Sequence, residues 1–302
     1  MKDIKSCASF SKVEPLCRGW SRDRKYYVET RAGEKLLLRL ADIQSFDRKK
    51  SEFMWLEKVA ALGLPTPKPL EFGLCEDGQS VYLLLTWCEG EDAEEVLGRL
   101  APAKQYALGV KTGEYLRRIH SLPAPPDVEP WDNRYGRKAR AKIDAYAACG
   151  FSFPGDELFV GYVEDNLHLL SGRPQSFQHG DYHGGNMVVS SAGEIAVIDF
   201  NRWDFGDPWE EFNRLIWSVK ASTVFAVGQL RGYFGGDPPL EFFSLLAFYT
   251  AVNTLASIPW SIPYGKGEVS AMLGLAEEIL GWFDQMTNPV PRWYRDYCPM
   301  RD

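Results

Sequence analysis

The chain has 302 residues, and its 41 acidic and 34 basic side chains give a formal net charge of −7. This acidic balance argues against nucleic-acid binding, so we expect no nucleic-acid partner. Hydrophobic residues at 45% and charged residues at 25% are typical of a globular protein of one large domain or two lobes. The six scattered cysteines form no Cys-x-x-Cys pair and the first residues have no apolar core, so we expect reduced thiols, no signal peptide and a cytoplasmic location.

A β-hairpin is predicted near the N-terminus. Residues 26–30 and 35–40 are rich in aromatic, β-branched and leucine side chains, and they flank a polar turn that contains Gly33. The short polar segment 18–23 comes before the hairpin and has one glycine. Its backbone amides and Ser21 are candidates for binding the phosphates of a nucleotide, and a plain hairpin loop is the alternative.

A helix is predicted over residues 46–62, with Gly63 as its stop signal. Glu52 lies on the same helical face as apolar side chains such as Leu56. A carboxylate on an apolar face needs a partner, because an unpaired buried charge is costly. Arg39 on the preceding strand is the predicted partner, and the alternative is that both side chains are exposed.

A hinge is predicted after the next strand. Three prolines between residues 65 and 69 favour an extended crossing, residues 81–86 favour a strand, and a short linker with a glycine follows. The carbonyl of Thr86 and the amide of Cys88 are candidates for binding the edge of a nucleobase. The predicted domains are an N-terminal nucleotide-binding lobe and a C-terminal catalytic and substrate-binding lobe, residues 1–87 and 88–302.

From residue 91 on, the chain is predicted to be mostly helical. One long uncharged stretch contains several serines, threonines and prolines, so we predict a buried helix with its exit loop there rather than a membrane span. We therefore expect no membrane partner. The predicted helices cover residues 104–120, 139–149 and 156–171, three or four more follow residue 207, and the uncharged stretch covers residues 242–264.

The most informative stretch is His-Gly-Asp-Tyr-His-Gly-Gly-Asn at residues 179–186. A strand candidate follows Asn186, a turn follows that strand, and a second apolar run ends in Asp199. If this hairpin pairs symmetrically about the Ala-Gly pair at 192–193, Asn186 and Asp199 are directly opposed, roughly 5 Å apart at Cα. The prediction is that one amide oxygen and one carboxylate converge from neighbouring strands.

These residue types fit the transfer of a phosphoryl group. Magnesium takes oxygen ligands and keeps several waters, so one amide, one carboxylate and nucleotide phosphates suit it. Asp181, in the loop before the hairpin, is placed to accept the proton of an attacking hydroxyl or to orient that hydroxyl. A base followed by two metal ligands in this order is typical of a phosphotransferase that acts on a nucleoside triphosphate.

Two other interpretations compete for the same stretch. A literal Asp-Phe-Gly occurs at residues 204–206, but it is five residues too far along the chain to face Asn186, so Asp199 is the predicted metal ligand. The pattern His179-x-Asp181-x-His183 puts three side chains on one face of an extended segment, which is compatible with zinc. With only four histidines in the chain, we favour a bracing role for His179 and an outer or solvated position for His183.

The complete set of motifs resembles the aminoglycoside phosphotransferase family, which shares the protein-kinase-like fold with choline and fructosamine kinases. The resemblance implies an α+β, protein-kinase-like two-lobe fold, with a small N-terminal β-sheet lobe that carries one helix and a larger, mainly helical C-terminal lobe. It covers nearly the whole chain. The residues that carry it are His179-Gly180-Asp181, Asn186, Asp199-Phe200, Gly206-Asp207-Pro208, Leu64-Pro65-x-Pro67, the 85–90 hinge and Ile119-His120-Ser121.

Roles follow from the resemblance residue by residue. Asp181 resembles the catalytic aspartate, and Asn186 and Asp199 resemble the Mg²⁺ ligands. Glu52 resembles the helix glutamate, while Arg39 stands where many members have lysine. The predicted nucleotide-binding residues, for ATP or GTP as donor, are Ser21, Arg39, Glu52, Thr86 and Cys88.

Two classes of function remain open. The first is an enzyme that moves the γ-phosphate to a hydroxyl of a small, cationic molecule, with an aminoglycoside-type antibiotic as the family's prior and an endogenous choline, amino alcohol or fructosamine as its main rival. The second is a catalytically inactive nucleotide-binding regulator, for which Arg39 is the support. All the groups that the chemistry needs are present, which favours the enzyme. The acceptor and the oligomeric state do not follow from the sequence.

The acidic residues after the motif carry one more hypothesis. Several of them could bind a polyamine acceptor, whose affinity would then fall with ionic strength. The equally good alternative is a solvated surface on which Glu210 and Glu211 only begin a helix. The residues concerned are Asp207, Glu210, Glu211, Asp237, Glu241, Glu277, Glu278 and Asp284.

Overall fold

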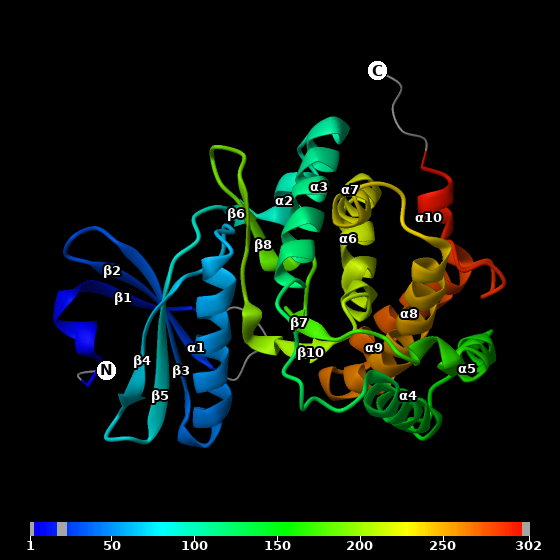
Figure 1. Cartoon of the computed structure of the whole chain (residues 1–302), viewed down its shortest axis with the longest axis horizontal. Coiled ribbons are helices and arrows are strands. Elements are labelled where there is room, and N and C mark those ends of the chain that lie inside the picture. The colour runs from blue at the N-terminus through cyan, green and yellow to red at the C-terminus, as the bar shows by residue number, and fades with distance from the viewer. Residues whose placement is uncertain (1–2, 17–22, 298–302) are drawn as a thin grey trace. The chain divides into compact units, whose positions relative to one another are not determined.

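The computed structural model describes residues 3–16 and 23–297 (Figure 1), so the predicted role of Ser21 lies outside the described residues. By its contacts the chain divides into two compact units. Unit 1 comprises Met1–Val96 and Gly185–Trp203, and unit 2 comprises Leu97–Gly184 and Asp204–Asp302. The predicted lobes, 1–87 and 88–302, stay a prediction about function, because units of contact and units of function need not coincide.

Unit 1 contains a five-stranded antiparallel sheet with the order β1-β2-β3-β5-β4. The predicted hairpin is confirmed, since the second and third strands pair directly around the turn at Gly33. The prolines of the predicted crossing end at Pro69, where β4 begins. The strands are β1 Phe10–Leu16, β2 Arg24–Thr30, β3 Lys35–Asp42, β4 Pro69–Cys75 and β5 Ser80–Thr86.

Side chains along β3 point alternately to the two faces of the sheet. Leu36, Leu38 and Leu40 are buried in one apolar cluster with Val28 of β2. Successive side chains of a strand point to opposite faces, so Arg39 lies on the other face. This face is the one that receives helix α1, Phe46–Ala61, whose stop was correctly predicted at the glycine two residues later.

The hairpin that carries the motif belongs to unit 1. Strand β8, Met187–Val189, pairs with β9, Ile195–Val197, and on its other side with the two-residue strand β6, Glu91–Asp92. The predicted register was wrong by one residue, because Met187 faces Val197. Asn186 therefore faces Ile198, whose N–H donates to the Asn186 carbonyl at 2.9 Å, and Asp199 lies one residue beyond.

The turn explains this register. The predicted pairing was symmetric about a two-residue turn, whereas the loop has three residues between Ser190 and Glu194, which are paired by a backbone hydrogen bond of 2.8 Å. Gly193 adopts the left-handed conformation with a φ of 78°, and its N–H donates to the Ser190 carbonyl. A type I turn followed by a left-handed glycine is a common three-residue hairpin loop.

Unit 2 is mainly helical, as predicted (Figure 1). The helix predicted over 139–149 begins eight residues earlier, at Trp131, because Trp131, Tyr135 and Ala139 recur every fourth residue and are all buried. The elements are α3 Pro102–Ile119, α4 Trp131–Ala147, α5 Asp156–Asp165, η3 Leu167–Leu170, β7 Ser176–Gln178, β10 Asp204–Gly206, η6 Glu210–Arg214, α6 Leu215–Ala221, α7 Thr223–Phe234, α8 Leu240–Ser261, η7 Ile262–Tyr264, α9 Lys266–Trp282 and α10 Arg292–Arg295. Two short elements, α2 Ala93–Leu97 and η4 Gly184–Asn186, span the unit boundaries.

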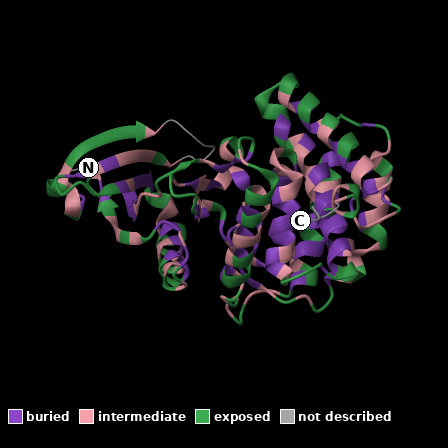
Figure 2. Ribbon diagram, turned by 90° about the horizontal axis from the view of Figure 1, so that it is seen from above, coloured by how far each residue is buried: buried purple, intermediate pink, exposed green. Residues whose placement is uncertain are grey.

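Helix α8 runs through the core of unit 2 and has buried side chains along most of its length. Figure 2 shows that buried residues are common among the helices of the chain. Together with η7, helix α8 forms a segment, Leu240–Tyr264, that is long and apolar enough to cross a membrane by length and composition, with a mean hydropathy of 1.4. In the structure, 72% of that window is buried inside the protein. This burial agrees with the predicted core helix and its exit.

Helices α3 and α7 approach each other through glycines. Gly109 and Gly113 of α3 face Gly228 and Gly232 of α7, and a Cβ atom at any of the four would collide with a backbone carbonyl of the opposite helix. Backbone oxygens cannot move aside as a flexible side chain can. The close approach therefore depends on hydrogen atoms at these four positions.

We predict that Gly113→Ala lowers the free energy of unfolding by about 2 kcal/mol or more, because its methyl group overlaps the Gln229 carbonyl oxygen. The matched control is Gly161→Ala in helix α5, where nothing lies within 4 Å of the added atom. There alanine should stabilise by about 0.5–1 kcal/mol. Denaturant unfolding of both variants is the measurement, and equal stabilities for the two would contradict the glycine-mediated packing.

Candidate functional site

Four charged side chains form a closed network on the α1 face of the sheet in unit 1. Arg39 of β3 donates to Glu52 of α1 at 2.6 Å and to Asp23 at 3.1 and 2.5 Å. Lys49, one turn before Glu52 on α1, donates to both carboxylates, at 2.6 Å to Asp23 and 3.0 Å to Glu52. The predicted Arg39–Glu52 pair is thus present, and two further residues complete it.

The network is buried and balanced in charge. Arg39, Lys49 and Glu52 are buried, and the Asp23 side chain is only 10% exposed. Burial disfavours the charged form of Arg39, but Glu52 and Asp23 outweigh it and hold the Arg39 pKa above its ordinary value. Burial likewise opposes ionisation of Asp23, but Arg39 and Lys49 hold the Asp23 pKa below its ordinary value. Arg39 and Asp23 therefore stay charged, and all four side chains use one another as partners.

Asp199 lies at the open end of the β8–β9 hairpin. It has a left-handed backbone with φ 64°, which is uncommon outside glycine and marks local strain that its surroundings must hold. The Lys25 ammonium of β2 donates to the Asp199 carboxylate at 3.3 Å. The backbone bond from Ile198 to Asn186 keeps the two predicted metal ligands at the same end of the hairpin.

These residues fit a magnesium ion. An aspartate carboxylate and an asparagine amide are hard oxygen donors, and two protein ligands leave room for water and phosphate oxygens, as Mg²⁺ prefers. Asp199 is 27% exposed, so its carboxylate is accessible to an incoming ion. Asn186 and Asp199 would hold the ion, which would neutralise charge on the phosphates of a nucleotide.

The predicted hinge residues occupy the end of β5. The Thr86 N–H donates to the Lys68 carbonyl at 2.9 Å, and the Thr86 hydroxyl accepts from the Lys68 N–H at 2.8 Å. Burial raises the pKa of the Cys88 thiol to about 11, so the thiol is neutral and unreactive at pH 7. Contact of the Thr86 carbonyl and the Cys88 amide with a nucleobase stays a prediction.

In unit 2 a buried carboxylate holds the loop that contains Asp181. Glu211 of η6 accepts the backbone N–H of His179 at 2.8 Å and of Gly180 at 2.6 Å. The His120 ring contacts the same carboxylate at 3.2 Å and Tyr233 on its other side at 2.9 Å. The loop conformation before Asp181 is therefore fixed by a residue that lies thirty-two positions after His179.

One arginine and one histidine lie beside Asp181 within unit 2. Arg214 of η6 lies 3.3 Å from the Asp181 carboxylate, and the His183 ring lies 3.8 Å from it. Arg214 is therefore placed to orient the Asp181 carboxylate.

The acidic residues that were proposed to bind a polyamine acceptor are mostly paired within the protein. Asp207 is buried against Arg173, at 2.7 and 3.0 Å, and accepts from Tyr249, while Glu211 binds the loop amides. Glu210 is buried and lies 3.7 Å from Lys138. Four of the more exposed acids are also paired, and the pairs are Asp237 with Arg231, Glu241 with Arg173, Glu278 with Lys220, and Asp284 with Arg292 and Arg295.

The structure shows where the residues of the two competing interpretations lie. Asp204 forms strand β10 with β7 and pairs with Arg134 of α4 at 2.5 Å, and it belongs to unit 2. His179 is fully buried, as expected for a bracing role, and accepts the Asp181 N–H at 3.2 Å. Over residues 3–16 and 23–297, no group of three or more histidine, cysteine or acidic side chains is arranged to hold a metal ion.

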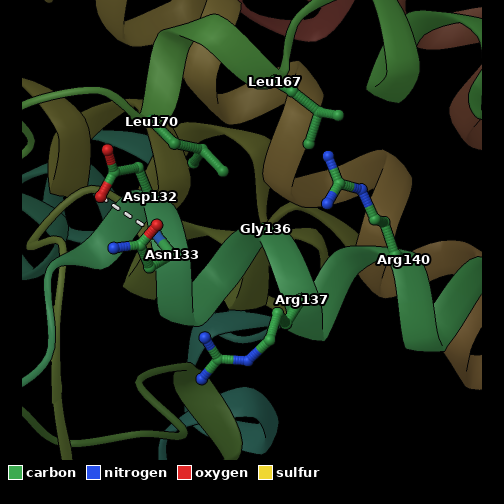
Figure 3. A pocket seen from close by; sticks show the side chains of 7 residues that line it. All are labelled: Asp132, Asn133, Gly136, Arg137, Arg140, Leu167 and Leu170. Atoms are coloured by element: carbon green, nitrogen blue, oxygen red, sulfur yellow. Dashed lines mark hydrogen bonds between the residues drawn. The ribbon is translucent and has the colours of Figure 1, made fainter.

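A pocket with a volume of about 390 Å³ lies between α4 and η3 of unit 2 (Figure 3). The predicted site residues do not line it, and its Arg137 is paired with Glu129 at 2.6 and 2.7 Å. We therefore do not assign it to the candidate active site. Its lining residues are Asp132, Asn133, Gly136, Arg137, Arg140, Leu167 and Leu170.

Sequence reasoning missed five residues of the site. Lys49 had a signal, because it lies three residues before Glu52 on the helix. Lys25 had none, because its place opposite Arg39 is known only from the register that the structure shows. Asp23, Glu211 and Arg214 had none, because their partners come from distant parts of the chain.

Comparison with known proteins identifies the sequence family. A family model described as "Phosphotransferase enzyme family" matches residues 12–243, which is more than half of the chain. No curated protein sequence is similar enough to this chain to count as a match.

Solved structures show the same fold. The amicoumacin kinase hAmiN in complex with AMP-PNP, Ca²⁺ and Ami has a TM-score of 0.68 at 15% identity, over 97% of this chain and 96% of that one. A thermostable mutant of aminoglycoside phosphotransferase APH(4)-Ia with ADP and hygromycin B has a TM-score of 0.62 at 20% identity, over 90% and 94%. A choline/ethanolamine kinase family protein from Mesorhizobium loti has a TM-score of 0.64 at 17% identity, over 96% and 95%. These matches confirm the predicted α+β, protein-kinase-like fold class.

We predict that Glu52→Gln lowers the free energy of unfolding by about 3–5 kcal/mol, because it leaves the buried charges of Arg39 and Lys49 with one carboxylate between them. Glu57→Gln, at an exposed position of the same helix, is the control and should change stability by less than about 0.5 kcal/mol. Chemical denaturation measures both. A Glu52 variant as stable as the Glu57 variant would show that the network contributes nothing.

Proposed function

Because the chain belongs to the phosphotransferase enzyme family, we propose that it is a Mg²⁺-dependent kinase that moves the γ-phosphate of ATP or GTP to a hydroxyl of a small molecule. The observation that carries this proposal is the end of the β8–β9 hairpin, where Asn186 and Asp199 offer oxygen ligands beside the Lys25 ammonium. Asp181 precedes this hairpin by only a few residues of chain.

Each residue has a defined task in the proposed reaction. Asp181 accepts or orients the proton of the acceptor hydroxyl, and Arg214 holds its carboxylate in place. Asn186 and Asp199 bind Mg²⁺, and the loop is kept in shape by Glu211. In phosphoryl transfer the protein contributes mainly positioning and electrostatic stabilisation, and these are the contributions that the described contacts supply.

The candidate acceptors are an aminoglycoside-type antibiotic and an endogenous metabolite. The family resemblance favours an aminoglycoside-type antibiotic, and the names of similar structures include kinases for antibiotics and a choline/ethanolamine kinase family protein. The ion pair of Arg214 with Asp181 and the internal pairing of acids such as Asp207 favour an acceptor with little positive charge over a polycation. A catalytically inactive regulator has less support, because Asp181, Asn186 and Asp199 are all present.

A coupled ADP-release screen tests the function. The panel comprises aminoglycosides, macrolides, choline, amino alcohols, fructosamines and hydroxylated acids, each with ATP and with GTP, with and without Mg²⁺. We expect Mg²⁺-dependent release above the acceptor-free background for one class. Tight nucleotide binding without release for any class would favour the regulator.

We predict that Asp181→Ala lowers kcat for the active acceptor by about 10²- to 10⁴-fold, because the group that receives the hydroxyl proton is lost. The dissociation constant of the nucleotide should stay within about threefold, since Asp181 is proposed to act on the acceptor. Steady-state kinetics and calorimetry measure the two quantities, with Asp165→Ala at an exposed position as control. A kcat within tenfold of the wild type would remove Asp181 from this role.

We predict that Asp199→Asn weakens Mg²⁺-dependent nucleotide binding by at least about tenfold, because a charged oxygen ligand becomes neutral. Asp204→Asn should leave the same affinity nearly unchanged, since Asp204 pairs with Arg134. Titration of the nucleotide with and without Mg²⁺ separates the metal-dependent part. If the two substitutions exchanged their effects, the assignment of the metal aspartate would be wrong.

A further inference from the structure

Among the residues that the structure describes, the cation closest to the proposed metal ligand is Lys25, which was not among the predicted site residues. It lies near the start of β2 and its Nζ is 3.3 Å from the Asp199 carboxylate. The two side chains are 13% and 27% exposed, so the pair is more enclosed than an ordinary surface ion pair. Lys25 is also directly opposite Arg39 in the β2–β3 register, which puts both side chains on the same face of the sheet.

Arg39 has the position expected of a phosphate ligand but not the free donors. Its Nε and one terminal nitrogen donate to Asp23, and the other terminal nitrogen donates to Glu52. A guanidinium binds a phosphate through the same planar fork that is directed here at two carboxylates. To reach a nucleotide, Arg39 would have to leave both carboxylates unpaired in a buried place, which is strongly unfavourable.

The Lys49 ammonium is paired with the same two carboxylates as Arg39. It lies between Asp23 and Glu52, at 2.6 and 3.0 Å, and the side chain is 8% exposed. The four charges of the network cancel, so the network as a whole offers no net positive charge to an anion. A polyphosphate that arrives at Asp199 needs a cation from outside the network.

We propose that Lys25 is the side chain that binds the polyphosphate of the nucleotide, and that Arg39 has become a structural residue that ties β3 to α1. This inference rests on the proposed function and names a further nucleotide-binding residue for it. Lysine suits the task because its ammonium is a compact charge with three donors on a flexible stem. Such an ammonium can contact Asp199 and a phosphate group of a bound nucleotide at the same time.

The first experiment labels the wild-type protein, so it does not depend on the folding of a variant. The probe is an acyl phosphate of ATP, whose acyl carbonyl is attacked by a nearby lysine amine, so that an amide forms and ATP leaves. Peptide mass spectrometry then locates the acyl group, with and without excess Mg²⁺-ATP. We expect labelling of Lys25 that the excess nucleotide suppresses. Suppressible labelling at Lys49 or another lysine, with Lys25 unlabelled, would overturn the inference.

The second experiment separates phosphate binding from a general structural role. Lys25→Met should weaken binding of the preferred nucleoside triphosphate by about 10- to 100-fold, the loss expected for a hydrogen bond between charged groups. Binding of the corresponding nucleoside, which has no phosphates, should not change. The control is Lys12→Met on the exposed strand β1, where Lys12 pairs with Glu14, and this variant should bind both ligands as the wild type does.

The outcomes distinguish the two proposals. If the wild type binds neither ATP nor GTP in the presence of Mg²⁺, the proposed function fails. If the wild type binds one of them and Lys25→Met binds it equally well, or loses the nucleoside to the same extent, only the role of Lys25 fails. Loss of triphosphate binding alone supports Lys25 as the phosphate ligand.

Discussion

The mutual neutralisation of four buried charges in unit 1 governs the candidate nucleotide site. Removing two cations and two carboxylates from water is costly, and the cost is offset only when every charge has a partner with good geometry. Arg39, Lys49, Asp23 and Glu52 meet that condition, and in doing so they fix helix α1 against strand β3. The same condition directs the Arg39 donors at Asp23 and Glu52, which is why we propose the lysine opposite it on β2 as the phosphate ligand.

A buried carboxylate has a comparable effect in unit 2. Glu211 accepts two consecutive backbone N–H groups of the loop before Asp181, and these donors would otherwise be unsatisfied inside the protein. Asp207 likewise joins Arg173, Tyr249 and the backbone of Trp209. Glu211 and Asp207 therefore stabilise the fold through internal contacts. The number of acidic residues in this part of the sequence does not by itself give the electrostatic potential at an acceptor. Arg214 beside the Asp181 carboxylate also contributes to that potential.

Much of unit 1 could be predicted from local patterns. Alternation along residues 35–40 indicated the strand and its buried leucines, and the helical spacing around Glu52 indicated the face that needs a cation. The Arg39–Glu52 pair followed because a strand and the helix directly after it are adjacent. The register of the β8–β9 hairpin was wrong by one residue because it depends on whether the turn has two or three residues, and a lone left-handed Gly193 decides between them. The first two turns of α4 were missed although the Trp131–Tyr135–Ala139 period was present.

The sequence by itself determined the motif residues Asp181, Asn186 and Asp199, the family resemblance and the fold class, because these depend on residue types at short, fixed spacings. Only the tertiary structure decided which charges are available for binding. Lys25 meets Asp199 across 174 positions of the chain, and Arg214 meets Asp181 across thirty-three. Packing between distant segments decides whether a charged side chain is paired within the protein or can bind a ligand. Local periodicity contains no information about such distances, so the sequence did not show that acids such as Asp207 are paired inside the protein, and it did not point to the lysine beside the predicted metal ligand.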